Sequence, residues 1–105
     1  MQFVETSAFT RRVQKLLDME AYATLQLHLL RNPAAGSVIR GTGGLRKIRW
    51  HSRSRGKRGG VRLIYYWLKD RDTILMLFVF GKSERADLSN EQKRILRQVV
   101  ERELR

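Results

Sequence analysis

The sequence contains no cysteine and only two histidines. Without cysteine there is neither a disulfide framework nor a thiolate nucleophile, and His28 and His51 are too far apart to form a zinc site without carboxylate ligands. We therefore expect a protein without a metal ion or other cofactor. No apolar run approaches the roughly 18 residues of a membrane span, and residues 1–5 lack the features of a signal peptide. These absences predict a cytoplasmic protein without membrane contact.

Acidic residues are absent from the 49 positions between Glu20 and Asp70. The same segment carries eleven lysines and arginines, so it accounts for nearly all of the net charge of +12. Packing so many like charges together costs free energy, which a polyanion relieves through attraction and counterion release. The charge pattern therefore predicts a nucleic-acid partner, the alternative being a solvated basic surface.

Several motifs of common enzymes are absent as well. The chain has no phosphate loop that ends in Gly-Lys-Ser or Gly-Lys-Thr, and the glycines of residues 41–44 do not stand between a predicted strand and a predicted helix, as in a dinucleotide fingerprint. The acids lie outside the basic segment, which gives little support to metal-assisted or two-carboxylate hydrolysis. Lysine, arginine and tyrosine remain as candidate functional groups.

Hydrophobic periodicity predicts an α+β fold in a single domain, residues 1–105, since a chain this short excludes a two-domain enzyme. The element order is β-α-α-β-β-β-α, with two N-terminal helices and a C-terminal helix packed on a small, mainly antiparallel sheet. Thr6 or Ser7 caps the first helix, the helices break near Asp18, and residues 89–92 form a capping box. The strands are predicted at 2–5, 45–51, 61–69 and 73–80, the helices between 7 and 31 and from 89 onward, and the segment 34–44 is predicted to be loop.

The strand at residues 45–51 has one cationic face. Arg46, Ile48 and Trp50 alternate with Lys47 and Arg49, so the two groups point to opposite sides. The following segment, residues 52–60, is too polar and too rich in glycine to be core, and it joins this strand to the next as an extended hairpin loop. Its basic residues are Arg53, Arg55, Lys57 and Arg58.

Basic residues suffice for one reaction, the cleavage of RNA. RNA carries its own nucleophile in the ribose 2′-hydroxyl, and arginines can hold the phosphate oxygens bidentately as negative charge develops. A lysine among other cations has a lowered pKa, which makes it a candidate general base. The basic surface is therefore a candidate for both the binding site and the catalyst.

The chain resembles the RelE superfamily of toxins, and most closely its HigB branch. The resemblance covers nearly the whole chain and includes the strand Leu45–Arg49, the basic loop from Arg55 to Gly60, the strand Val61–Tyr66 and the segment Phe80–Arg85. It implies a type II toxin that enters the ribosomal A site, cleaves mRNA without a metal ion and thereby inhibits translation. Its implied partners are mRNA, the ribosome with its ribosomal RNA, and an antitoxin of the helix-turn-helix, HigA-like type.

The resemblance also implies residue roles. Lys47 and Arg49 match the family's basic strand residues, Arg62 its phosphate-binding arginine, and Lys82 its basic segment after the last strand; these four are the predicted catalytic residues. The family's arginine and catalytic tyrosine of that last segment have no match, since Ser83 follows the lysine and no tyrosine stands near Leu88. Tyr66, Lys82, Lys57 and Arg58 stay open as general acid or base. The predicted RNA-binding residues are Arg46, Arg53, Arg55, Lys57, Arg58 and Tyr66.

Two other functions stay open: a ParE-like toxin that acts on gyrase, and a non-catalytic RNA- or DNA-binding module. Individual residues also have structural alternatives. Arg62 suits a structural salt bridge, because buried arginines are usually paired, and Lys47 and Arg49 suit a solvated sheet edge. The tyrosines and tryptophans of the strands are more often packing residues than base-stacking ones.

Overall fold

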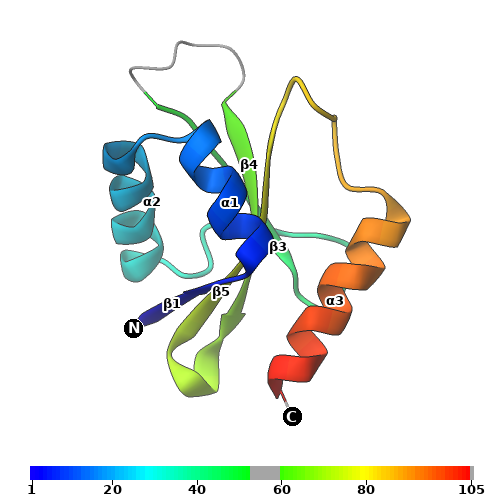
Figure 1. The fold of residues 1–105 in the computed structure, drawn as a ribbon. Coiled ribbons are helices and arrows are strands. Elements are labelled where there is room, and N and C mark those ends of the chain that lie inside the picture. The colour runs from blue at the N-terminus through cyan, green and yellow to red at the C-terminus, as the bar shows by residue number, and fades with distance from the viewer. Residues whose placement is uncertain (53–59, 105) are drawn as a thin grey trace.

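The computed structural model describes residues 1–52 and 60–104. In these residues it contains one five-stranded sheet with the strand order β1-β5-β4-β3-β2, together with three α-helices (Figure 1). β1 pairs in parallel with β5, and the other neighbours are antiparallel. The strands are β1 (Gln2–Glu5), β2 (Ser37–Val38), β3 (Arg46–Trp50), β4 (Val61–Leu68) and β5 (Thr73–Gly81), and the helices are α1 (Ser7–Leu16), α2 (Met19–Arg31) and α3 (Asn90–Leu104).

The predicted α+β fold is confirmed, with one additional strand. β2 lies inside the segment 34–44, for which the prediction of loop was wrong at these two residues. Its residues pair with Lys47 and Arg46 of β3, and both are exposed. A strand of two exposed residues leaves no hydrophobic alternation in the sequence, and periodicity therefore cannot detect it.

Side-chain caps begin the helices where the sequence predicts them. The Thr6 hydroxyl and the Asp18 carboxylate each accept a hydrogen bond from the backbone N–H three residues later, at 3.0 and 2.7 Å. The break between α1 and α2 is therefore a second N-cap. Ser89 and Gln92 form the capping box in both directions, at 3.1 and 2.9 Å. Among the described residues, no helix is long and apolar enough to cross a bilayer.

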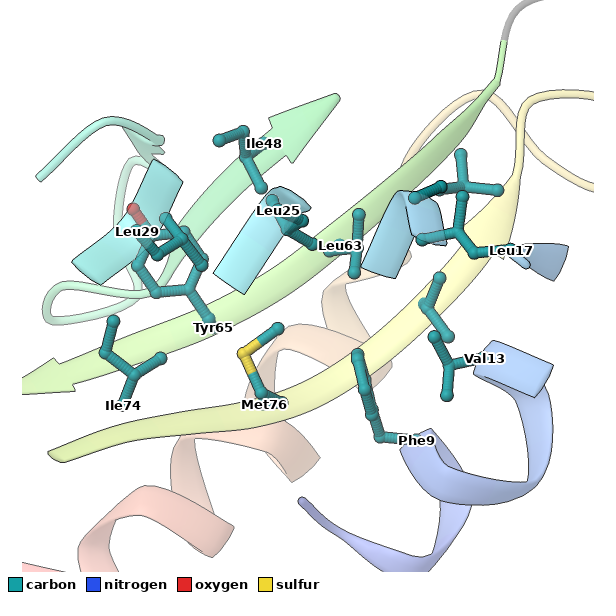
Figure 2. Close-up of a cluster of buried hydrophobic side chains, with 13 residues drawn as sticks. Phe9, Val13, Leu17, Leu25, Leu29, Ile48, Leu63, Tyr65, Ile74 and Met76 are labelled. Atoms are coloured by element: carbon teal, nitrogen blue, oxygen red, sulfur yellow. The ribbon is translucent and has the colours of Figure 1, made fainter. Parts of the chain in front are cut away.

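α1 and α2 cover one face of the sheet. Tyr65 lies at the centre of this core, where its hydroxyl donates to the Pro33 carbonyl and accepts from the Gly36 N–H, both at 2.8 Å. The polar end of the side chain is thus satisfied inside the core. The apolar stripes Phe9, Val13, Leu17, Ala21, Leu25 and Leu29 pack on Ile48, Leu63, Tyr65, Ile74 and Met76 (Figure 2).

α3 and the segment before it lie on the opposite face of the sheet (Figure 1). Leu88 and Val100 pack there with Leu45, Ile64, Leu75, Leu77 and Phe80. β4 and β5 are therefore buried on both faces, which explains their nearly continuous apolar sequences.

Candidate nucleic-acid interface

The strand register brings three of the predicted catalytic residues to one sheet face. Lys47 and Arg49 point away from α1 and α2, because β3 alternates its side chains. Arg49 pairs directly with Arg62 of β4, and Lys47 pairs with Ile64. Side chains that face each other across an antiparallel pair have Cβ atoms about 5 Å apart, where like charges destabilise the sheet. The register thus places Arg49 and Arg62 at neighbouring positions of β3 and β4.

The predicted catalytic residues differ in exposure. Arg62 is only 7% exposed, 27% of the Lys47 side chain is exposed, and Arg49 and Lys82 are exposed. Arg62 has a partner within the chain, as a buried arginine requires. The Lys82 N–H donates to the carbonyl of Gly60, at 3.3 Å, so Lys82 lies at the same end of the sheet as Arg49 and Arg62. The four residues therefore combine one fixed guanidinium with charges that solvent can reach.

Arg85 belongs to the same surface, although the sequence did not single it out. Its guanidinium carbon lies over the rings of Phe78 and Phe80, at 5.6 and 5.8 Å from their centroids, and Phe80 is the β5 partner of Arg62. The buried Arg85 Nε has no hydrogen-bond partner among the described residues. The only signal in the sequence was its position three residues after Lys82. We call Lys47, Arg49, Arg62, Lys82 and Arg85 the basic surface.

Glu84 and Arg12 anchor the turn that carries the last two cations of the basic surface. The Glu84 carboxylate accepts hydrogen bonds from the Gly81 N–H, at 2.9 Å, and from the Arg12 guanidinium. Arg12 also donates to the carbonyl of Val79, at 2.7 Å. The hydrogen bond from Gly81, followed by that from Arg12, lowers the pKa of Glu84. α1 is thereby tied to the end of β5.

Replacing Glu84 with glutamine is expected to lower the free energy of unfolding at neutral pH by no more than about 1 kcal/mol, because the ion pair is partly exposed. The pKa of folded Glu84 lies below its ordinary value of 4.5. The contribution is therefore present above that pH and is lost as the pH falls through the folded pKa. Urea unfolding should give different free energies of unfolding for the wild type and the Glu84→Gln variant at neutral pH, and equal ones at about pH 2. A difference of the same size at both pH values would contradict this role, and Glu103→Gln, a change of an exposed α3 glutamate, is the control.

Asp87 places a carboxylate beside the basic surface. Its Oδ1 lies 3.5 Å from the Nζ of Lys47. Burial raises the pKa of Asp87, but the hydrogen bond from the Leu88 N–H and the charges of Lys47 and Lys93 outweigh burial and lower the pKa below its ordinary value. The carboxylate is therefore ionised at neutral pH and stabilises the ammonium of Lys47.

The structure places Arg46 on the other face of β3 and Tyr66 away from Arg62. Arg46 lies on the opposite face of β3, where its guanidinium donates to the carbonyls of Ala34 and Gly36, at 3.2 and 2.8 Å. Tyr66 follows Arg62 by four residues of β4, or roughly 13 Å along the strand. The Tyr66 ring lies under the guanidinium of Arg97, whose Cζ is 5.6 Å from the ring centroid. Side-chain alternation sets the face of Arg46, and the strand rise sets the distance of Tyr66. Tyr66 is thus too far from Arg62 to act as general acid or base at the same phosphate.

Comparison with solved structures identifies the fold. The chain is similar to the isolated E. coli RelE toxin, with a TM-score of 0.57 and 19% identity over 93% of this chain and 97% of that one. This chain has the RelE fold. It is also similar to a double arginine-to-alanine mutant of E. coli RelE in the free state (TM-score 0.58, 16% identity, 81% and 86% of the two chains) and to the E. coli RelBE toxin-antitoxin complex (0.59, 22%, 80% and 98%). No family model matches the sequence.

Four predicted RNA-binding residues, Arg53, Arg55, Lys57 and Arg58, lie outside the described residues. In the sequence they connect β3 to β4. Within residues 1–52 and 60–104 of this RelE fold, no three His, Asp or Glu side chains gather closely enough to hold a metal ion.

The ring of His28 lies 5.3 Å from that of Trp50, and the indole N–H of Trp50 donates to the carbonyl of Ala21 at 2.9 Å. Trp50 is thus a packing residue rather than a base-stacking one.

Proposed function

We propose that this protein is the toxin of a type II toxin-antitoxin system, a ribosome-dependent endoribonuclease of the RelE type and most like the HigB branch. The observation that carries the proposal is the basic surface, in which β3, β4 and the turn after β5 bring cations together toward one end of the sheet of a RelE fold. The negative charge of an mRNA phosphate would attract these cations. Action on the ribosome implies a cytoplasmic protein.

The proposed reaction uses the ribose 2′-hydroxyl as nucleophile and needs no metal ion. A general base takes the proton of the 2′-hydroxyl, and the 2′-oxygen attacks the phosphorus. The bond from phosphorus to the 5′-oxygen then breaks, which leaves a 2′,3′-cyclic phosphate, and the departing 5′-oxygen takes up a proton. Arg62, Lys82 and Arg85 hold the phosphate oxygens, and they favour the transition state because its negative charge is greater than that of the substrate. Guanidinium groups suit this role because they bind phosphate oxygens in pairs.

Lys47 and Arg49 bind the adjoining part of the message as cations. The ion pair with Asp87 holds the Lys47 side chain at one side of this surface. Lys82 within the described residues, and Lys57 and Arg58 outside them, are the candidates for the general base. An enzyme without a dedicated base depends on the ribosome to align the 2′-oxygen with the phosphate. The loop segment 53–58 is proposed to hold ribosomal RNA.

An apolar groove supports an antitoxin as the second partner. It has a volume of about 260 Å³ and lies between α1, β5 and α3. Ile95 of α3, at its rim, is 47% exposed. Exposed apolar grooves of this kind suit a peptide segment of a partner protein. Since the E. coli RelBE complex pairs the same fold with an antitoxin, we propose a helix-turn-helix, HigA-like antitoxin as its occupant. The lining residues are Thr6, Ala8, Leu77, Phe78, Gln92, Ile95, Leu96 and Val99.

Inducible expression of the full chain in bacteria tests the proposal. We expect growth arrest together with new 5′ ends inside translated messages, mapped by primer extension, whereas an early-stop version of the gene has no effect. Co-expression of an adjacent gene for a small helix-turn-helix protein should restore growth. Arrest with intact messages and a DNA-damage response would instead indicate a ParE-like toxin. Normal growth with intact messages would favour a non-catalytic nucleic-acid-binding module.

Replacing Arg85 with alanine is expected to slow the cleavage of ribosome-bound mRNA by about 10²-fold, because the transition state loses one fixed cation. Single-turnover cleavage on purified ribosomes measures the effect. Arg11→Ala removes an exposed arginine of α1 and is the matched control, with an unchanged rate. If the two variants cleave at the same rate, Arg85 has no part in the reaction.

A further inference from the structure

A second cationic surface lies on the other side of α3 from the apolar groove. It is a groove of about 550 Å³ between α3 and the turn of residues 40–44. Its side chains include four cations and one carboxylate, and none of them is apolar. The lining residues are Arg40, Gly41, Thr42, Asn90, Lys93, Arg94, Arg97, Gln98 and Glu101. We call this surface the α3 groove.

The turn that forms one wall is held in place. Thr42 is 4% exposed, and its hydroxyl donates to the Ile39 carbonyl at 2.6 Å and accepts from the Leu45 N–H at 3.2 Å. Gly43 adopts a positive φ of 72°, and a Cβ at this position would lie 3.0 Å from the guanidinium carbon of Arg97. The turn therefore approaches α3 as closely as a glycine allows, and it presents Arg40 beside the helix.

The cations of the other wall come from one side of α3. Lys93 and Arg97 are four residues apart and lie one above the other. Arg97 is fixed by its hydrogen bond to the Gly43 carbonyl, at 3.2 Å, and by its ion pair with Glu101, at 3.6 Å. Lys93 lies close enough to Asp87 for its charge to act on that carboxylate. Because Asp87 also pairs with Lys47, the α3 groove adjoins the basic surface.

The lining decides which class of partner fits. Protein partners bury an apolar core within their interface, and the α3 groove offers no apolar side chain to such a core. A sugar-phosphate backbone requires cations and hydrogen-bond donors alone. We propose that the α3 groove is a second RNA-binding surface, which holds the phosphate backbone of RNA next to the basic surface. The choice of RNA over DNA rests on the proposed function, whereas the preference for a polyanion rests on the groove.

The test compares two double variants of the full chain that lose the same charge. R40A/K93A removes two exposed or half-buried cations of the α3 groove, and R11A/R31A removes two exposed arginines of α1 and α2. Fluorescence anisotropy measures the affinity for a labelled single-stranded RNA between about 50 and 200 mM salt. R40A/K93A should flatten the slope of log K against log salt by about 1.4, since each single-strand phosphate contact contributes about 0.7. The R11A/R31A slope should equal that of the wild type.

Three outcomes would overturn the inference. The salt slope is unchanged in R40A/K93A, or it changes equally in both double variants. In the third, R40A/K93A loses binding to polyglutamate, an acidic polypeptide used as a second probe, while its binding to RNA is unchanged. Cleavage on ribosomes separates this inference from the proposed function. There R40A/K93A should raise KM and leave kcat unchanged, as the loss of uniform binding does. A wild-type chain that binds RNA through the α3 groove but never cleaves it would refute the proposed nuclease and leave the groove intact.

Discussion

Replacing Arg62 with glutamine is expected to slow mRNA cleavage on the ribosome by about 10²–10³-fold, which is the usual loss when one preorganised group that stabilises developing charge is removed. Arg62 is the most buried cation of the basic surface and pairs across the sheet with Arg49 and Phe80. It is therefore already positioned before the message binds. Single-turnover cleavage on purified ribosomes measures the effect.

The burial of Arg62 requires a control for folding, because a structural arginine would lose activity only with the folded fraction. Thermal unfolding of Arg62→Gln, followed by circular dichroism, supplies the folded fraction at the assay temperature. Arg62→Lys keeps the charge but not the bidentate geometry, so it should cleave at an intermediate rate. Arg31→Gln, an exposed change on α2, should match the wild type. A folded Arg62→Gln variant that cleaves at the wild-type rate would exclude phosphate binding by this residue.

Replacing Phe9 with alanine is expected to lower the free energy of unfolding by about 3–5 kcal/mol, the usual cost of truncating a buried phenylalanine. Phe9 is 0% exposed and its ring lies 5.8 Å from that of Tyr22, so α1 and α2 meet at this side chain. The cavity would open between both helices and the sheet (Figure 2). Urea unfolding at neutral pH, followed by circular dichroism, gives the difference.

The control for Phe9 is another apolar residue at a helix of the same layer. Met19 at the start of α2 is 90% exposed, and Met19→Ala should change the free energy of unfolding by no more than about 0.5 kcal/mol. If the two substitutions cost the same, the core does not lie where the structure places it. Because α1 also carries Arg12, which anchors the turn after β5, Phe9→Ala should in addition reduce cleavage at temperatures where the wild type is still folded.

The helices and their ends were predictable because their signals are local. A cap such as Thr6 or Asp18 acts on a backbone N–H three residues away, and the apolar stripe of a helix repeats within a few residues. The same holds for the face of β3 that carries Lys47 and Arg49, since alternation follows from strand geometry alone. These parts of the prediction needed no knowledge of distant segments.

The composition of the site was less predictable because it depends on pairing between distant segments. Arg85 joins the basic surface only because the turn after β5 folds back over the rings of Phe78 and Phe80. Arg46 leaves the predicted set because its face of β3 meets the carbonyls of the 34–36 segment. Asp87 was outside the prediction, yet it pairs with Lys47 across forty residues of sequence. No periodicity or motif encodes such contacts.

The sequence patterns of short segments thus determined the α+β class, the helix caps, the basic middle segment and the alternation of β3. Which cations lie together and which carboxylate joins them were decided only when the strands paired and the helices covered the sheet. The physical reason is range: capping, periodicity and net charge are properties of short segments, whereas the neighbours of a charged group follow from strand register and packing between segments far apart in the sequence.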